Sequence, residues 1–464
     1  MILMKILHYS LGLPPYRTGG LAKYSIDLIN SQLQANHEVF LLFPGHFNIT
    51  KKTLIRLESE IQELKVFEIV NPLPISLLGG IGDPIRFMKS VYPKDIYHSF
   101  LSNVKPDIIH IHTLMGIHKE FFMAAKELNI KLVFTTHDYY GICPKVNLLD
   151  YNEDVCIDND NGKKCIICNQ NAYSLPLIYL MQSKTYRMFK DNELIKKMRK
   201  RKNEAIKEQS TNTIQKDGKI DSVLANKFNN LRDYYFEIFH LIDYFHFNSE
   251  NTKNEFEKYF DIKGAVLPVS HSDITDNREN KFYNENKPLK ISFLGPLDKY
   301  KGFPLLRESL NRLLSRGQMN WELNVYGNSM ELALEKIEKE HIFYHGRYQH
   351  TELKNIFANT DILIVPSVWK ETFGFIGLEA LAFGVPVIVS NNVGFKDVIQ
   401  DGKTGIIFNP ESKELSSLIE SLIRDRKILQ SMNQNICNED FPYTLEKHAK
   451  DIESLYKEVI GVLA

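Results

Sequence analysis

Residues 361–390 constrain the fold more than any other stretch, because they read DILIVPSVWKETFGFIGLEALAFGVPVIVS. The apolar runs 362–365 and 385–390 predict two strands that are buried on both faces, as in a parallel sheet. Between these strands, Thr372 can cap a helix that begins near Gly374. The unit places its loop at the sheet edge where doubly wound α/β folds bind their ligands.

Two glutamates bracket that predicted helix start. Glu371 precedes it, and Glu379 follows inside the helix. The amide groups at a helix start suit a phosphate, and carboxylates accept hydrogen bonds from hydroxyl groups. A nucleotide sugar offers both kinds of group, although the spacing of the two acids alone fits an ordinary surface helix equally well.

The segment resembles the signature of retaining glycosyltransferases of the GT-B fold, in group 4, which includes sucrose-phosphate synthase and bacterial polysaccharide glycosyltransferases. The resemblance rests on Glu371 and Glu379, on Phe373-Gly374, on Gly384-Val385-Pro386-Val387, on Gly394 and on Asp401-Gly402-Lys403-Thr404-Gly405. It covers residues 290–412 well and the remainder more loosely. It implies an α/β protein with two facing, doubly wound Rossmann-like domains and a cleft between them.

The same resemblance implies a retaining hexosyl transfer from a nucleotide-diphosphate sugar of the UDP or GDP type to an acceptor hydroxyl. Glu371 would bind hydroxyls of the donor sugar, Lys301 its diphosphate, and His137 the sugar from across the cleft. The remaining donor-binding positions would be Gly19, Gly20, Gly295, Gly327, Gly346, Thr372, Phe373, Gly374 and Glu379, the last of these on the ribose. Lys301 and backbone amides would replace a catalytic metal, so no cofactor is expected for catalysis.

One position departs from the family pattern. Pro296 stands where an arginine is usual, so one clamp on the diphosphate is missing or is supplied from elsewhere. This departure leaves room for a non-catalytic subunit that binds a nucleotide sugar. A nucleotide-sugar epimerase of the same fold is a further alternative.

Apolar runs alternate with helical patterns through the first half of the chain, which predicts another doubly wound sheet. The expected strands are 4–8, 39–43, 66–70, 108–111, 132–135 and 241–247. His137 follows the fifth of them, at the edge where side chains face a ligand, whereas His110 and His112 are expected to be structural. Gly19 and Gly20 follow the first strand and also fit a plain turn into a helix.

Four cysteines, Cys143, Cys156, Cys165 and Cys168, lie in one polar segment after His137. Four thiolates satisfy a tetrahedral Zn²⁺, and two residues between Cys165 and Cys168 is a normal half-site spacing. The spacing of twelve residues between Cys143 and Cys156 is less typical of a zinc half-site. A structural zinc ion is therefore expected, with free thiols and disulfides as the alternatives.

Lysine and arginine are clustered in residues 184–208. Such a run can contact an anionic membrane peripherally, which suits a glycan or lipid-linked glycan acceptor, but it can equally be a solvated helix face. Over the whole chain, 57 basic residues balance 57 acidic residues, which gives no general attraction to nucleic acid.

The chain of 464 residues shows neither a signal peptide nor an apolar run of about 20 residues. We therefore expect a cytoplasmic protein, with peripheral contact at the inner membrane face, that takes part in bacterial surface polysaccharide or glycoconjugate assembly. The expected organisation is an acceptor-side domain over 1–275 with an insert at about 139–240, a nucleotide-sugar domain over 286–440, and a helix over 441–464 that crosses back.

Overall fold

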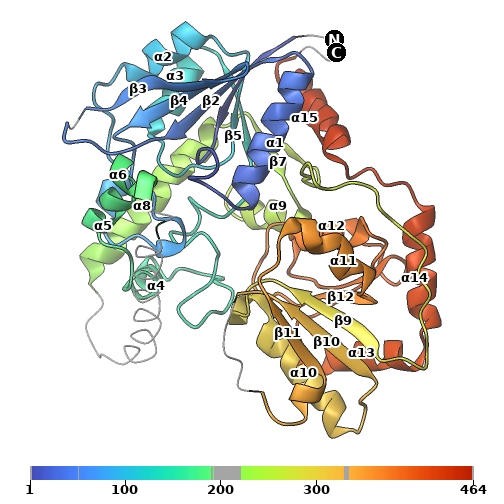
Figure 1. The fold of residues 1–464 in the computed structure, drawn as a ribbon. Coiled ribbons are helices and arrows are strands. Elements are labelled where there is room, and N and C mark those ends of the chain that lie inside the picture. The colour runs from blue at the N-terminus through green and yellow to red at the C-terminus, as the bar shows by residue number, and fades with distance from the viewer. Residues whose placement is uncertain (1–2, 51, 190–191, 193–220, 329–333, 462–464) are drawn as a thin grey trace.

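The computed structural model describes the chain except residues 1–2, 51, 190–191, 193–220, 329–333 and 462–464. Two sheets, each with helices packed against it, make up the two halves of the molecule (Figure 1). The prediction of two Rossmann-like, doubly wound α/β halves is confirmed. Of the basic cluster at 184–208, residues 190–191 and 193–208 lie outside the described residues.

The first sheet has eight strands in the order β3-β4-β2-β1-β5-β6-β7-β8. They are β1 (Lys5–Tyr9), β2 (Glu38–Pro44), β3 (Leu54–Ile61), β4 (Leu64–Val70), β5 (Ile108–Ile111), β6 (Lys131–Thr135), β7 (Tyr244–Phe247) and β8 (Gly264–Val266). All pairings are parallel except that of the edge strand β3 with β4. The sequence analysis missed β3, because its residues are mostly exposed and lack the apolar run of a buried strand.

The helices of the first half are α1 (Gly20–Gln34), α2 (Ile96–Val104), α3 (Lys119–Glu127), α8 (Ser222–Leu241) and α9 (Glu250–Glu257), with short turns η1 (Leu77–Gly79) and η2 (Pro84–Phe87). Between β6 and α8 lie three short helices, α4 (Lys163–Cys168), α5 (Leu175–Met181) and α6 (Lys184–Phe189). The strand expected from residue 241 begins only at Tyr244, because α8 continues through Leu241.

The second sheet is entirely parallel, with six strands in the order β11-β10-β9-β12-β13-β14. They are β9 (Leu289–Leu294), β10 (Trp321–Tyr326), β11 (Ile342–Gly346), β12 (Ile362–Val365), β13 (Val387–Ser390) and β14 (Gly405–Phe408). Its helices are α10 (Phe303–Ser315), α11 (Leu353–Ala358), α12 (Phe375–Leu381), α13 (Ser412–Arg424) and α14 (Lys427–Asn438), with turns η3 (Lys299–Lys301), η4 (Glu338–Glu340), η5 (His350–Glu352) and η6 (Gly394–Val398).

The chain passes between the two halves twice. The first passage joins β8 to β9, and the second joins α14 to the last helix, α15 (Leu445–Val459), which packs against α1 of the first half (Figure 1). The two passages are bonded to each other: Ser270 Oγ donates to the Tyr443 carbonyl at 2.6 Å, and Arg278 Nη1 donates to the Glu439 carbonyl at 2.7 Å.

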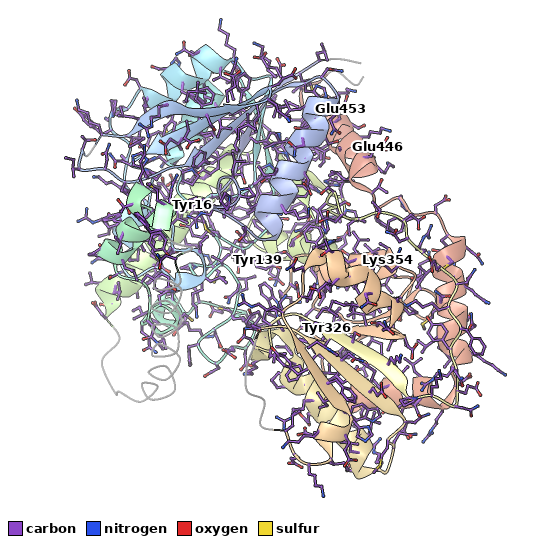
Figure 2. The ribbon with its side chains drawn as sticks, viewed as in Figure 1. Tyr16, Tyr139, Tyr326, Lys354, Glu446 and Glu453 are labelled. Carbon is purple, nitrogen blue, oxygen red and sulfur yellow. The ribbon has the colours of Figure 1, made fainter. Side chains whose placement is uncertain are left out.

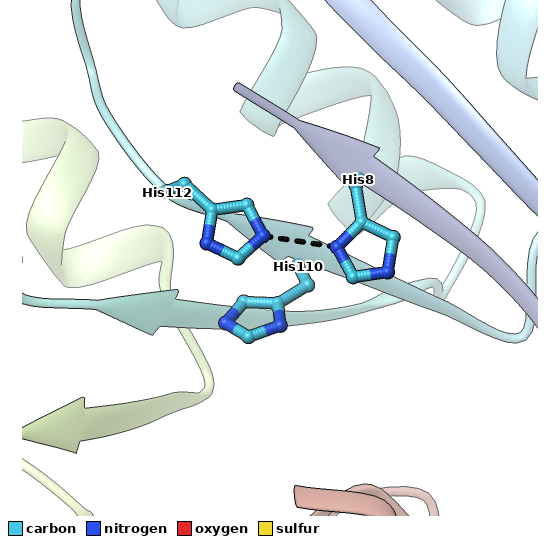
Figure 3. A group of neighbouring side chains, drawn as sticks. All are labelled: His8, His110 and His112. Atoms are coloured by element: carbon cyan, nitrogen blue, oxygen red, sulfur yellow. Dashed lines mark hydrogen bonds between the residues drawn. The ribbon is translucent and has the colours of Figure 1, made fainter. Parts of the chain in front are cut away.

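Buried histidines form a polar layer beneath α15. Figure 3 shows His8, His110 and His112 side by side on β1 and β5 and just after β5, with 2.9 Å between His8 Nδ1 and His112 Nε2. Burial lowers the pKa of all three rings, that of His8 to about 4. These rings are therefore neutral hydrogen-bonding groups at physiological pH.

Helix α15 is tied to this layer by two side-chain pairs. Tyr456 Oη lies 2.5 Å from His110 Nδ1, and His448 Nε2 lies 2.8 Å from Tyr24 Oη of α1. Apolar packing reinforces these bonds, since one buried cluster includes Leu28 of α1, Phe373 of the second half and Ile452 of α15. The described helices include none whose length and apolar character would let it cross a lipid bilayer.

We predict that Tyr456→Phe destabilises the protein, because it leaves a buried nitrogen of His110 without its partner. The expected loss is about 1–3 kcal/mol of unfolding free energy, measured by urea denaturation. Tyr92→Phe is the control, because the Tyr92 side chain is 61% exposed. A Tyr456→Phe protein as stable as the control would show that the hydroxyl does not hold α15 in place.

Candidate functional site

The centre of the site is an ion pair between two neighbouring loops at the carboxyl edge of the second sheet. Lys301 Nζ, in η3 after β9, lies 2.6 Å from Glu371 Oε1, in the loop after β12. Ser367 Oγ donates to the other carboxylate oxygen of Glu371 at 2.8 Å. The pair is largely shielded from solvent, with side-chain exposures of 23% for Lys301 and 12% for Glu371.

The backbone around this pair holds the two loops together. Gly302 has a φ of 76°, and a Cβ there would lie 1.8 Å from the carbonyl oxygen of Pro366. Only glycine permits this approach. The Val368 amide donates to the Tyr300 carbonyl at 3.0 Å, and the Trp369 ring centroid lies 5.3 Å from Lys301 Nζ. The ammonium group is therefore held at a defined position before any ligand arrives.

A second polar cluster surrounds Glu379 on α12. This buried carboxylate lies 3.1 Å from His350 Nε2 and 3.3 Å from His271 Nε2. Burial tends to raise the pKa of Glu379, but the hydrogen bonds from His271 and His350 outweigh burial, so its pKa is lowered. The bond to Glu379 in turn raises the pKa of His350. Glu379 is thus an ionised hydrogen-bond acceptor at neutral pH.

The loop from Glu371 to α12 touches the first half of the molecule. Thr372 Oγ1 donates to the His137 carbonyl at 3.1 Å, and Ser249 Oγ donates to the Thr372 carbonyl at 2.6 Å. The prediction that Thr372 caps the helix is wrong, because the N-cap is Gly374, with a φ of 96° and no side-chain bond. The threonine hydroxyl instead joins the two halves, beside the buried Phe373.

His137 lies directly after β6, at the edge that faces this loop. Its Nε2 is 3.4 Å from His112 Nδ1, and its ring packs edge-on to Tyr24 with 4.7 Å between centroids. Burial, together with nearby His246, lowers the pKa of His137 to about 3. His137 is therefore a neutral donor or acceptor of hydrogen bonds, next to the loop that carries Glu371.

The sequence analysis did not single out Asp138, although it adjoins His137. Burial raises the pKa of Asp138 to about 6, while a hydrogen bond from the Tyr140 amide opposes the rise. Perturbed carboxyl groups of this kind collect at functional sites. Its position one residue beyond a strand-end histidine was the signal that could have drawn attention to it.

The predicted glycines line the same edge of each sheet. In the second sheet, Gly295 and Gly346 flank Gly327: the Gly295 amide bonds to the carbonyl of Tyr326, and the Gly327 amide to the carbonyl of Gly346. In the first half, Gly19 caps α1, and the next residue, Gly20, faces the Phe375 ring of α12. The structure thus brings the predicted glycines to the same two edges as His137, Lys301 and Glu371.

Pro296 follows Gly295 and contributes no cation. The nearby Lys299 points to the first half instead, where its Nζ donates to the Asn152 carbonyl at 2.8 Å and lies 3.7 Å from Asp154. Lys299 therefore contacts the cysteine-containing segment. Lys299 is not paired with Glu371, and Lys301 is the cation that binds this carboxylate.

The four cysteines of the insert are neighbours but do not form a closed ligand set. Burial raises the pKa of Cys165 to about 12, and the charges of Cys143, Cys168 and Cys156 add to the rise. Among the described residues, the histidine, cysteine and acidic groups with ligand atoms within 4.8 Å of one another are His8 with His110 and His112, and His271 with Asp273 and His350. The four sulfurs would have to move closer together to bind one ion.

Together, these residues offer a fixed cation, two carboxylates and a neutral imidazole where the two sheets face each other. The cation suits a phosphate group, and the carboxylates suit hydroxyl groups. No residue of this set is a strongly basic nucleophile, so the arrangement favours recognition of a phosphorylated, hydroxyl-rich ligand.

Family models match both halves of the chain. Residues 274–438 match the model described as Glycosyl transferases group 1, and residues 18–152 match the model described as Glycosyltransferase Family 4. The two matched ranges contain His137, Lys301, Glu371 and Glu379.

Curated relatives match parts of the chain. The chain is 39% identical over 157 residues to an uncharacterized 41.2 kDa protein in the cps region of Klebsiella pneumoniae, covering 32% of this chain and 43% of that protein. It is 28% identical over 167 residues to the capsular polysaccharide biosynthesis glycosyltransferase CapM of Staphylococcus aureus, covering 34% and 43%. The chain thus spans less than half the length of these relatives.

Solved structures share the whole architecture at low identity. Sucrose-phosphate synthase from Thermosynechococcus elongatus superposes with a TM-score of 0.55 at 13% identity, covering 99% of this chain and 100% of that one. Anabaena HepE in complex with UDP and glucose gives a TM-score of 0.52 at 13% identity, covering 97% and 99%. These similarities show that the fold is GT-B.

We predict that His350→Gln changes the pH dependence of stability. The raised pKa of His350 gives stability that is complete below its ordinary value of 6.5 and is lost as pH rises through the raised value. The lowered pKa of Glu379 gives stability that is present above its ordinary value of 4.5 and is lost as pH falls through the lowered value. The pair therefore contributes most between those two ordinary values.

Thermal unfolding of wild type and His350→Gln at about pH 5.5 and about pH 8.5 measures this contribution. The variant should lose more stability at the lower pH. His345→Gln is the control, because His345 bonds to the neutral amide of Asn324. Equal losses at both pH values would contradict an ion pair between His350 and Glu379.

Proposed function

We propose that this chain is a GT-B glycosyltransferase of group 1 that transfers a sugar from a nucleotide-diphosphate sugar to an acceptor hydroxyl, with retention of configuration. The ion pair of Lys301 with Glu371 is the observation that carries this proposal. It places a cation and a hydroxyl-binding carboxylate within hydrogen-bonding distance of each other. A ligand in which a diphosphate is joined directly to a sugar needs these two groups side by side.

In this proposal, Lys301 binds the donor diphosphate and stabilises the charge that grows on it as the glycosidic bond breaks. Glu371 then accepts hydrogen bonds from sugar hydroxyls, with Ser367 holding its second oxygen in place. Since the pair is already formed, little rearrangement is needed when the donor binds. The leaving diphosphate accepts the proton of the attacking hydroxyl on the same face of the sugar.

Glu379 serves as the ribose ligand. Its carboxylate is ionised and held by His271 and His350, so it accepts hydrogen bonds from vicinal hydroxyls without needing to lose a proton first. His137 contacts the donor sugar from the first half as a neutral imidazole, in keeping with its lowered pKa. No divalent metal takes part, because Lys301 performs the charge neutralisation.

What two similar proteins bind or take part in supports the proposed donor and acceptor classes. HepE binds UDP and glucose, and CapM acts in capsular polysaccharide biosynthesis. We propose a UDP- or GDP-linked hexose as donor and a glycan or lipid-linked glycan as acceptor, in the assembly of a bacterial surface polysaccharide. The protein would act in the cytoplasm, with peripheral contact at the inner membrane face.

A non-catalytic subunit that binds a nucleotide sugar is the main alternative, and Pro296 is the observation that favours it. Such a subunit has no need for a charged pair at the reacting end of the donor. An active-site substitution therefore separates the two functions.

We predict that Glu371→Gln lowers sugar transfer at least about 100-fold, because it replaces a charged contact with the reacting sugar by a neutral one. The purified variant is incubated with a panel of nucleotide sugars, and transfer and donor hydrolysis are followed. The control is Glu411→Gln, since Glu411 is exposed and its side chain caps no helix. Wild-type turnover in folded Glu371→Gln protein would remove Glu371 from the mechanism.

We also propose that the insert binds one structural Zn²⁺ through Cys143, Cys156, Cys165 and Cys168. Four thiolates are a suitable donor set once the segment closes around the ion, and metal binding would offset the cost of deprotonating them. The ion would order the segment that follows His137 and leave the chemistry to the residues named above.

Elemental analysis of protein purified without a metal-affinity tag should find about one equivalent of zinc. The metal should be lost from Cys165→Ser/Cys168→Ser and retained in Cys437→Ser, which alters the cysteine outside the insert. Four thiols that are freely alkylated in metal-free native protein would identify them as ordinary loop residues.

A further inference from the structure

Two arginines meet at the carboxyl edge of the first sheet, away from the Lys301 site. Arg17 belongs to the loop between β1 and α1, and Arg187 lies on α6. Their guanidinium carbons are 4.6 Å and 4.2 Å from the ring centroid of Tyr16. Tyr16 is labelled in Figure 2. Residues far apart in sequence are thus gathered around one aromatic ring.

Part of the hydrogen-bonding capacity of these arginines is not used within the described part of the chain. Arg17 Nε, Arg187 Nε and Arg187 Nη2 are buried and have no acceptor there. Leaving a buried charged donor unpaired is costly. The Tyr16 ring contacts the faces of both guanidinium groups. It provides no hydrogen-bond acceptor for the three buried N–H groups.

Glu68, the acid that pairs with Arg187 among the described residues, does not provide acceptors for these nitrogens. Glu68 Oε2 is 3.9 Å from Arg187 Nη1 and only 3.0 Å from His46 Nδ1, while Glu68 Oε1 accepts from Arg56. The unpartnered nitrogens of Arg187 are its other two. Burial lowers the pKa of Arg17, and the neighbouring charge of Arg187 adds to this effect. Among the described residues, Glu68 is the carboxylate paired with Arg187, and it is shared with His46 and Arg56.

The position of the arginines connects them with the proposed reaction. Arg17 lies two residues before Gly19, and Gly20 faces Phe375 at the start of the helix that follows Glu371. An anion bound by the arginines would therefore sit on the first half, across from the donor residues. That is the side left for the acceptor when the second half holds the donor.

We propose that Arg17 and Arg187 form an oxyanion site that binds a phosphate, diphosphate or carboxylate group of the acceptor. This inference rests on the proposed glycosyl transfer and adds that the acceptor is an anionic molecule. The planar guanidinium groups supply several N–H donors in a fixed geometry, which matches the oxygens of such groups. The anion would also neutralise two like charges that the fold holds close together.

The test is a binding measurement that needs no donor and no turnover. Full-length protein carrying Lys301→Ala, which removes the donor-side cation, is titrated calorimetrically with phosphate, pyrophosphate and glucuronate. Saturable binding of at least one anion is expected. Arg17→Gln and Arg187→Gln should each weaken it about tenfold or more, the effect of one lost charged hydrogen bond.

Lys184→Gln is the matched control, because it removes one positive charge from the exposed start of α6 and should leave binding unchanged. If a glutamine variant fails to fold, Arg17→Lys and Arg187→Lys replace it. Lysine keeps the positive charge but lacks the planar set of N–H donors, so these variants should also weaken anion binding. Preference for phosphate or pyrophosphate identifies a phosphorylated acceptor, and preference for glucuronate identifies an acidic sugar.

The proposal is overturned if no anion binds saturably, or if binding persists unchanged in both arginine variants. It is also overturned if Lys184→Gln weakens binding as much as they do, because binding would then reflect general charge. None of these results depends on sugar transfer. Failure of the transferase proposal would instead appear as wild-type turnover in Glu371→Gln, so the two failures can be told apart.

Discussion

The pairing of Lys301 with Glu371 is the interaction on which the rest of the site depends. The pair joins the loops that follow β9 and β12. Because Gly302 has no side chain, the loop after β9 can pack directly against Pro366 in the loop after β12. Two opposite charges that are largely removed from water stabilise each other only when both are in place. Any ligand that displaces one of them must therefore satisfy the other, which links recognition of an anion with recognition of hydroxyl groups.

Hydrogen bonds join the two halves of the molecule at the loop that carries Glu371. Thr372 binds the backbone of His137, and Ser249 binds the backbone of Thr372. Because these contacts involve the loop that carries Glu371, a change in the spacing of the halves changes the environment of the carboxylate. The neutral histidines of the first half add hydrogen-bonding groups without adding charge.

Sequence patterns predicted the parallel strands well, because long apolar runs such as 362–365 mark strands buried on both faces. They did not predict β3, an exposed edge strand, nor the true role of Thr372, whose hydroxyl bonds across the two halves instead of capping its own helix. The roles of His350 and His271 beside Glu379 were also missed. His271 and His350 come from separate segments of the chain. Their spacing in the sequence does not predict that both lie beside Glu379.

The paired passages of the chain between the halves have a mechanical consequence. Ser270 and Arg278 bind them to each other through the carbonyls of Tyr443 and Glu439, so the halves are joined by a double strap and not by a single tether. Two passages that are bonded to each other restrict the relative placement of the halves more than one passage would. The edges that carry Lys301 and Arg17 therefore keep a defined position relative to each other.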